Sequence, residues 1–198
     1  MKFIDIAFGA TLVAFGLGSL AGALLTALSL GSREFILILV NIRIIGPVRT
    51  ASGWGAIALV FLIFLNNCVP VVLSFLYALV IVKVRWTPPM SLVLRNRLLS
   101  AFSLLTAGLL GFFNLGATMM LVAEIRGSAA ANVLLRTSWI HAPLEFLFVL
   151  ACVAEPLRLT LRTGEGKVVK TLRSDTTLLL LCLVGLLVSA AIEVLAAL

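Results

Sequence analysis

Charged residues are scarce in this 198-residue sequence, and glutamine is missing altogether. Only 12% of the residues are charged, against about a quarter in an average soluble domain. By contrast, 62% are hydrophobic and the mean hydropathy is +1.23. This balance excludes a soluble globular domain and predicts a chain whose solvent is the lipid bilayer.

Residues that bind metals or form disulfides are equally few. The sequence has one histidine and three cysteines, and no two cysteines are spaced as CxxC. Neither a zinc site nor a disulfide framework is therefore predicted. The HExxH and GxSxG motifs of hydrolases are also missing. We expect no metal, no cofactor and no enzymatic activity, with a Ser–His dyad through His141 as the remaining catalytic alternative.

Basic residues outnumber acidic ones, with 15 Lys and Arg against 8 Asp and Glu and a formal charge of +7. No basic cluster comes with aromatic residues spaced for stacking on bases, so nucleic acid is not expected as a partner. The basic residues lie between apolar runs, where they set orientation and contact lipid headgroups. Roughly two thirds fall on the side of the N-terminus, which predicts a cell-membrane protein with its N-terminus in the cytoplasm and its C-terminus outside.

Five apolar runs are each near or above the roughly 20 residues that a helix needs to cross a bilayer. Backbone groups in lipid must find partners within the protein, and runs of this length suit helices rather than barrel strands. The predicted fold is an all-α polytopic membrane helix bundle, with residues 1–198 in one transmembrane domain. The expected spans are residues 6–30, 54–82, 98–123, 137–154 and 176–197.

Two segments near the N-terminus need separate interpretation. The uncharged run from Ile6 to Ser32 is too long for the core of a signal peptide, so it is expected to stay as the first span. The apolar part of Glu34–Arg49 is short, which favours an interfacial or re-entrant helix. If this segment crossed the membrane, there would be six spans and the downstream orientation would invert.

Small residues recur at every fourth position of the first span. Ala10, Ala14, Gly18 and Gly22 therefore lie on one face of the predicted helix. Small residues at this spacing let two helix backbones approach closely within a membrane. The face predicts a close helix contact, which serves either a homo-oligomer or another membrane protein, or packing within one bundle.

Polar residues gather at a similar depth in three of the predicted spans. His141 and Glu145 lie four residues apart on one helix face, in an otherwise apolar run. At a rise of 1.5 Å per residue, Asn66, Asn67 and Asn114 fall within about 8 Å of the depth of Glu145. Pro70 cannot donate to the carbonyl of Asn66, which adds a freed acceptor in the same turn.

The polar residues carry a resemblance to a known family. The stretches are FLIFLNNCVPVVLSFLYALV (Phe61–Val80), GFFNLGATMMLVAEIRG (Gly111–Gly127) and WIHAPLEFLFVLACVAEPLRL (Trp139–Leu159). In order and spacing they resemble the stage II sporulation protein M family of integral membrane proteins. The chain has Ile140 and Ala142 where family members usually have proline and glycine around the histidine, so it resembles a divergent member. The resemblance implies a non-enzymatic component of a membrane complex that remodels cell wall, assembled with peptidoglycan-degrading partners.

Two functions fit these observations. The first is a non-enzymatic membrane scaffold or assembly component, in which the five polar residues form a hydrogen-bonded core between helices. The alternative is a small transporter or channel in which Glu145 and His141 carry a proton or an ion, because ionisable groups inside a membrane are often functional. The sequence favours the scaffold.

Overall fold

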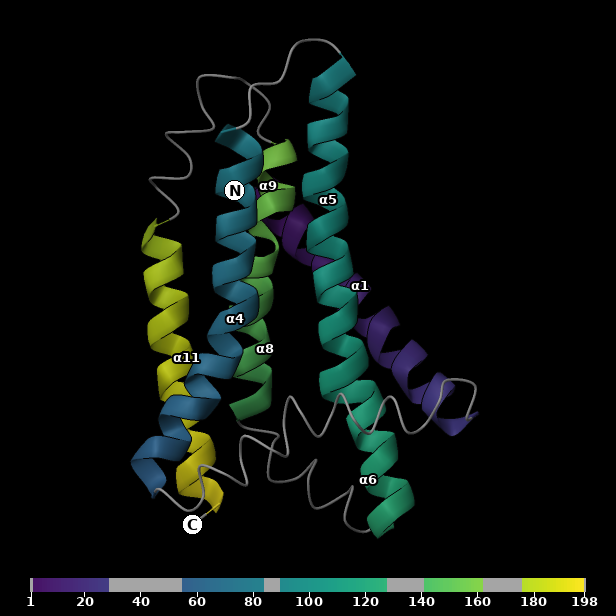
Figure 1. Ribbon diagram of the computed structural model, residues 1–198, viewed down its shortest axis with the longest axis vertical. Helices are drawn as coiled ribbons and strands as arrows, with labels where there is room; N and C mark the ends of the chain where they lie inside the picture. The colour runs from purple at the N-terminus through teal and green to yellow at the C-terminus, as the bar shows by residue number, and fades with distance from the viewer. Residues whose placement is uncertain (1, 29–54, 84–89, 128–140, 162–175, 198) are drawn as a thin grey trace.

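The computed structural model describes residues 2–28, 55–83, 90–127, 141–161 and 176–197 (Figure 1). Every regular element in these ranges is a helix, which confirms the predicted all-α bundle. The expected helix over 34–49 lies outside the described residues. The helices are α1 (Lys2–Ala27), α4 (Ala56–Lys83), α5 (Met90–Leu110), the π-helix η2 (Gly111–Ala117), α6 (Thr118–Arg126), α8 (His141–Val153), α9 (Glu155–Leu161) and α11 (Thr176–Ala197).

Among the described residues, four helical segments are long and apolar enough to cross a membrane. They are Ile6–Ala27, Ala56–Ile81, Leu92–Ala123 and Thr177–Leu195. Their outer faces carry exposed leucine and valine side chains, such as Leu17, Val80 and Leu181. Lipid tails are as apolar as these side chains, so the exposed faces indicate a membrane location.

The fourth expected span, residues 137–154, differs from the helix in the structure. Of that range the structure describes α8, whose 13 residues extend about 20 Å and fall short of the roughly 30 Å hydrocarbon core. The chain turns at Ala154 and continues as α9 to Leu161. The helical run is therefore broken in the middle and ends later than the apolar pattern predicted.

The third expected span is part of a longer helical run. The run begins at Met90, eight residues before the expected start at residue 98, and continues through η2 and α6 to Arg126. η2 is a π-helix, the wider helix type in which a backbone N–H bonds to the carbonyl five residues earlier instead of four. The hydroxyl of Thr118 donates to the Phe113 carbonyl, which occupies one acceptor at the end of this wider turn.

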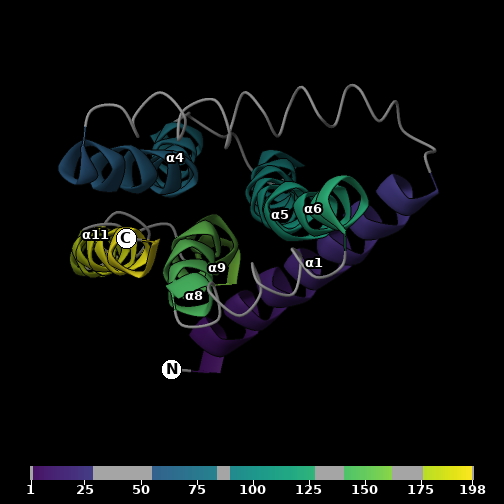
Figure 2. The ribbon, with the colours of Figure 1, turned by 90° about the horizontal axis from the view of Figure 1, so that it is seen from below.

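The helical runs α4, α5–α6, α8–α9 and α11 alternate in direction along the chain (Figure 1). α4 and α8–α9 run one way, whereas α5–α6 and α11 run the other way. α1 crosses the others obliquely and packs mainly against α5 and η2 (Figure 2). The ends of α4 and α9 and the starts of α5 and α11 therefore share one side of the bundle.

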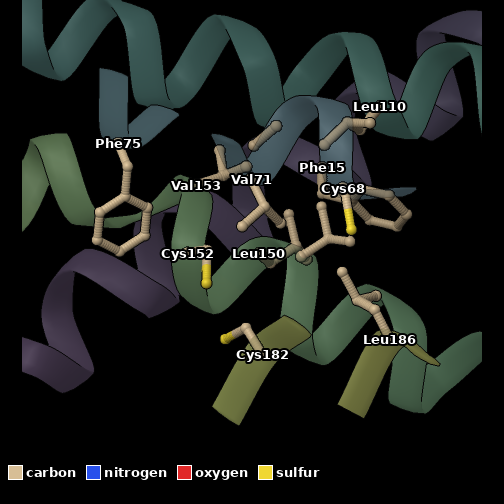
Figure 3. Packing of buried hydrophobic residues seen from close by; sticks show 12 residues of the cluster. Phe15, Cys68, Val71, Phe75, Leu110, Leu150, Cys152, Val153, Cys182 and Leu186 are labelled. Carbon is tan, nitrogen blue, oxygen red and sulfur yellow. The ribbon is translucent and has the colours of Figure 1, made fainter. Parts of the chain in front are cut away.

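The main hydrophobic core lies where α1, α4, α5, α8 and α11 meet (Figure 3). Val71, Leu150 and Leu186 are fully or almost fully buried there. Phe15 of α1 stacks at a tilt on Phe146 of α8, with ring centroids 4.9 Å apart. A smaller cluster of Ala78, Leu99 and Leu159 joins α4, α5 and α9.

Candidate functional site

The two predicted asparagines of α4 differ in their burial. Asn67 is 8% exposed and Asn66 is half-buried. Pro70 lies inside α4, and the helix continues past it to Lys83. The hydroxyl of the fully buried Ser74 donates to the Pro70 carbonyl at 2.7 Å. The predicted proline therefore interrupts one backbone hydrogen bond without ending the helix.

Asn114 lies in the π-helix η2, where it is half-buried. The main partner of η2 is α1. Gly111 and Gly116 of η2 are buried directly against the backbone of α1. A Cβ atom at Gly111 would collide with the Phe15 carbonyl, and one at Gly116 with the Ser19 carbonyl. Asn114 thus sits in the element that fits closely against α1.

The predicted His–Glu pair begins α8. His141 is the first residue of that helix, and its side chain lies outside the described part of the chain. Glu145 is half-buried and close enough to Glu193 of α11 for the two carboxylates to interact electrostatically. Glu193 was not among the residues predicted for the polar core.

The predicted polar core is only partly assembled. α4 and α8 pack against each other, which brings the helices of Asn67 and Glu145 together. Among the described residues, no hydrogen bond joins the side chains of Asn66, Asn67, Asn114 and Glu145. The four residues share helices that belong to one bundle, but they do not form one network.

Within the described ranges, the most deeply buried charges belong to a pair that was not predicted from the sequence. The Glu155 side chain is fully buried and Arg158 is 4% exposed. Nη1 of Arg158 donates to Oε2 of Glu155 at 2.9 Å. The Nε atom of Arg158 is buried and has no hydrogen-bond partner among the described residues. The pair thus occupies a site from which water is excluded.

The break between α8 and α9 positions this ion pair. Pro156 has no N–H to donate, so the carbonyl four residues back loses its helical partner. The N–H of Leu157 donates instead to the hydroxyl of Ser103 on α5 at 3.1 Å. The N–H of Arg158 bonds to the Ala154 carbonyl at 2.9 Å, which restarts the helix. α9 then packs against α5, α4 and α1.

A signal for this site was present in the sequence. The stretch VAEPLRLTL continues the apolar pattern of α8, and it places a glutamate and an arginine three residues apart beside a proline. Opposite charges at this spacing meet on one helix face. Because the expected span ended at residue 154, both charges fell outside it and were not predicted to be buried.

The small-residue face of α1 packs within the chain. A Cβ atom at Gly18 would collide with the Gly108 backbone of α5, and one at Gly22 would meet the Phe112 carbonyl oxygen of η2. Ala14 lies beside Gly108, whereas Ala10 is half-buried. The predicted face could contact another protein or pack within the bundle, and Gly18 and Gly22 pack within the bundle. Oligomer formation stays a prediction that needs another surface.

Within the described ranges, no group of three His, Cys, Asp or Glu side chains could hold a metal ion. The arrangement offers instead a buried ion pair, a pair of interacting carboxylates and several hydroxyls bonded to carbonyls. No family model, curated protein or solved structure matches the chain. The resemblance to the stage II sporulation protein M family therefore stays a prediction.

Proposed function

We propose that the chain is a non-enzymatic scaffold or assembly component of a complex in the cell membrane, with its N-terminus in the cytoplasm and its C-terminus outside. The observation that carries this proposal is the buried Glu155–Arg158 pair. Its charges bond to each other at 2.9 Å instead of facing a solvent path. The pair lies on a helix that contacts three others, so its position suits a structural role.

Other buried polar groups support the same proposal. The hydroxyls of Ser74 and Thr26 donate to carbonyls of their own helices at 2.7 Å. Ser103 accepts the Leu157 N–H across two helices. Side chains that bond to the backbone in this way are not free to bind a passing solute. The family resemblance adds peptidoglycan-degrading proteins as the proposed partners.

A small transporter or channel is the second candidate, and the proximity of Glu145 to Glu193 favours it. The two carboxyl groups come from neighbouring apolar helices, and acidic side chains inside a membrane often mark a proton or ion pathway. The two candidates differ in what they require of Glu145. A scaffold does not need an ionisable group there, whereas a proton carrier needs a carboxyl group.

The deciding experiment compares wild type with Glu145→Gln in two assays. Cross-linking in native membranes, followed by gentle solubilisation, measures assembly into a larger complex. Reconstitution into liposomes containing a pH-sensitive dye measures proton flux. For the scaffold we expect the same complex with both proteins and no flux above empty liposomes. Proton flux that Glu145→Gln abolishes, in a protein that still assembles, would replace the scaffold with the transporter.

A further inference from the structure

Two of the three cysteines face each other across a helix interface. Cys152 of α8 is fully buried and Cys182 of α11 is 1% exposed, and both are free thiols. α8 and α11 pack together along their length. The sulfur atoms of the two residues are turned toward each other, whereas Cys68 lies elsewhere in the cluster (Figure 3).

The buried ion pair lies next to these thiols. Cys152 stands three residues before Glu155, on the other side of the turn at Ala154. Glu155 and Arg158 are both close enough to act electrostatically on both sulfurs. The two sulfurs therefore lie beside charged side chains and are not surrounded by apolar side chains alone.

The thiols are closed to water but lie close to lipid. α11 is at one end of the bundle (Figure 2), and its outer face exposes Leu181 and Val184 on either side of Cys182. A water-soluble reagent would have to cross this apolar layer. A reagent dissolved in the bilayer needs only a small opening between α8 and α11.

We infer that Cys152 and Cys182 form a redox-active dithiol that a lipid-soluble quinone oxidises to a disulfide joining α8 to α11. In the reaction the two S–H bonds break and one S–S bond forms. The two thiols lose two electrons and two protons. The quinone accepts the two electrons and the two protons and becomes the quinol. The inference does not depend on the proposed scaffold function, because it concerns a different pair of residues.

The test counts free thiols in the intact protein reconstituted in liposomes. The reduced protein is treated with a short-chain quinone, then denatured and labelled with a maleimide. We expect one label per chain, on Cys68, instead of three, and an intact mass lower by two hydrogen atoms before labelling. Reduction with a phosphine should restore all three labels. The readout uses the wild-type chain, so it does not depend on a variant that folds.

Matched variants and a second oxidant complete the test. Cys68→Ala should go from two labels to none, whereas Cys152→Ala and Cys182→Ala should each keep two. Oxidised glutathione, which stays in water, should leave all three thiols of the wild type free. Three labels after quinone treatment would overturn the inference. So would a disulfide-linked dimer, or equal oxidation by glutathione.

Discussion

The two sides of the bundle are held together by different kinds of contact. Between α1 and α5–η2 the backbones meet directly, since glycines 18, 22, 111 and 116 leave no room for a Cβ atom. Between α8–α9 and its neighbours the space is filled by side chains, including Leu150, Cys152 and a charged pair. A backbone contact leaves no room for an added side-chain atom, whereas the charged side-chain contact needs both of its opposite charges. Different kinds of substitution should therefore destabilise the two regions.

The largest effect is expected from breaking the charged pair. Arg158→Met leaves the Glu155 carboxylate buried without the guanidinium, which should lower the free energy of unfolding by about 3–5 kcal/mol. Replacing both residues, as Glu155→Leu with Arg158→Met, should restore much of this loss because no charge stays buried. Detergent titration of the purified protein, followed by circular dichroism, measures the change. The exposed Arg97→Met is the control and should shift stability by about 0.5 kcal/mol at most.

The next effect comes from the backbone contact of α1. Gly18→Ala should destabilise the fold by about 3 kcal/mol, since the added methyl group meets the Gly108 backbone and neither helix can yield without separating. Gly16→Ala is a matched control on the same helix, because a Cβ atom there meets nothing within 4 Å. Equal stability of the two variants in detergent titration would contradict the close approach of α1 to α5.

A smaller effect is expected where a glycine faces a side chain. A Cβ atom at Gly185 of α11 would collide with the ring of Phe148 on α8. A ring can turn aside, so Gly185→Ala should cost about 1–2 kcal/mol, less than Gly18→Ala. The same titration gives the difference. If Gly185→Ala proved the more damaging of the two, side chains rather than backbone would set the tighter contact.

The smallest effect tests the hydrogen bond between α5 and α9. Ser103→Ala removes the acceptor of the Leu157 N–H and should cost about 1 kcal/mol. Hydrogen exchange measured by mass spectrometry should show faster exchange at Leu157, with little change in α11. Unchanged exchange at Leu157 would mean that this N–H has another acceptor.

The long helices could be predicted from sequence because an apolar run of 20 or more residues has few alternatives in lipid. α11 covers Thr176–Ala197, the range expected for the fifth span, and α4 covers Ala56–Lys83 where 54–82 was expected. The continuation of α8 into α9 was not predicted. A span that is ended at the first charged residues excludes a buried charged pair. The contacts of α9 with α4 and α5 are needed to show that Glu155 and Arg158 lie inside the helix bundle.

The candidate site was predictable in part for a similar reason. The small-residue face of α1 shows that a helix must approach closely, but spacing does not say which helix does so. The depth of Asn114 was read from an assumed straight α-helix, and its neighbours depend on rotation about the axis as well as depth. The π-helix that sets this rotation has no distinct pattern in the sequence GFFNLGA.

The π-helix also has a consequence for insertions and deletions. A turn closed over five residues instead of four accommodates one residue more than an α-helix of the same length, so η2 is equivalent to a single-residue insertion. Removing one residue from Gly111–Ala117 would let the α-helix run uninterrupted and would leave α6 facing nearly as it does now, because the wider turn absorbs the extra residue. Removing one residue from the α-helix before Gly111 would instead rotate α6 by about 100° relative to the start of α5, and Leu121, now 3% exposed, would turn away from its neighbours. A deletion should therefore be tolerated better within η2 than in the α-helix that precedes it.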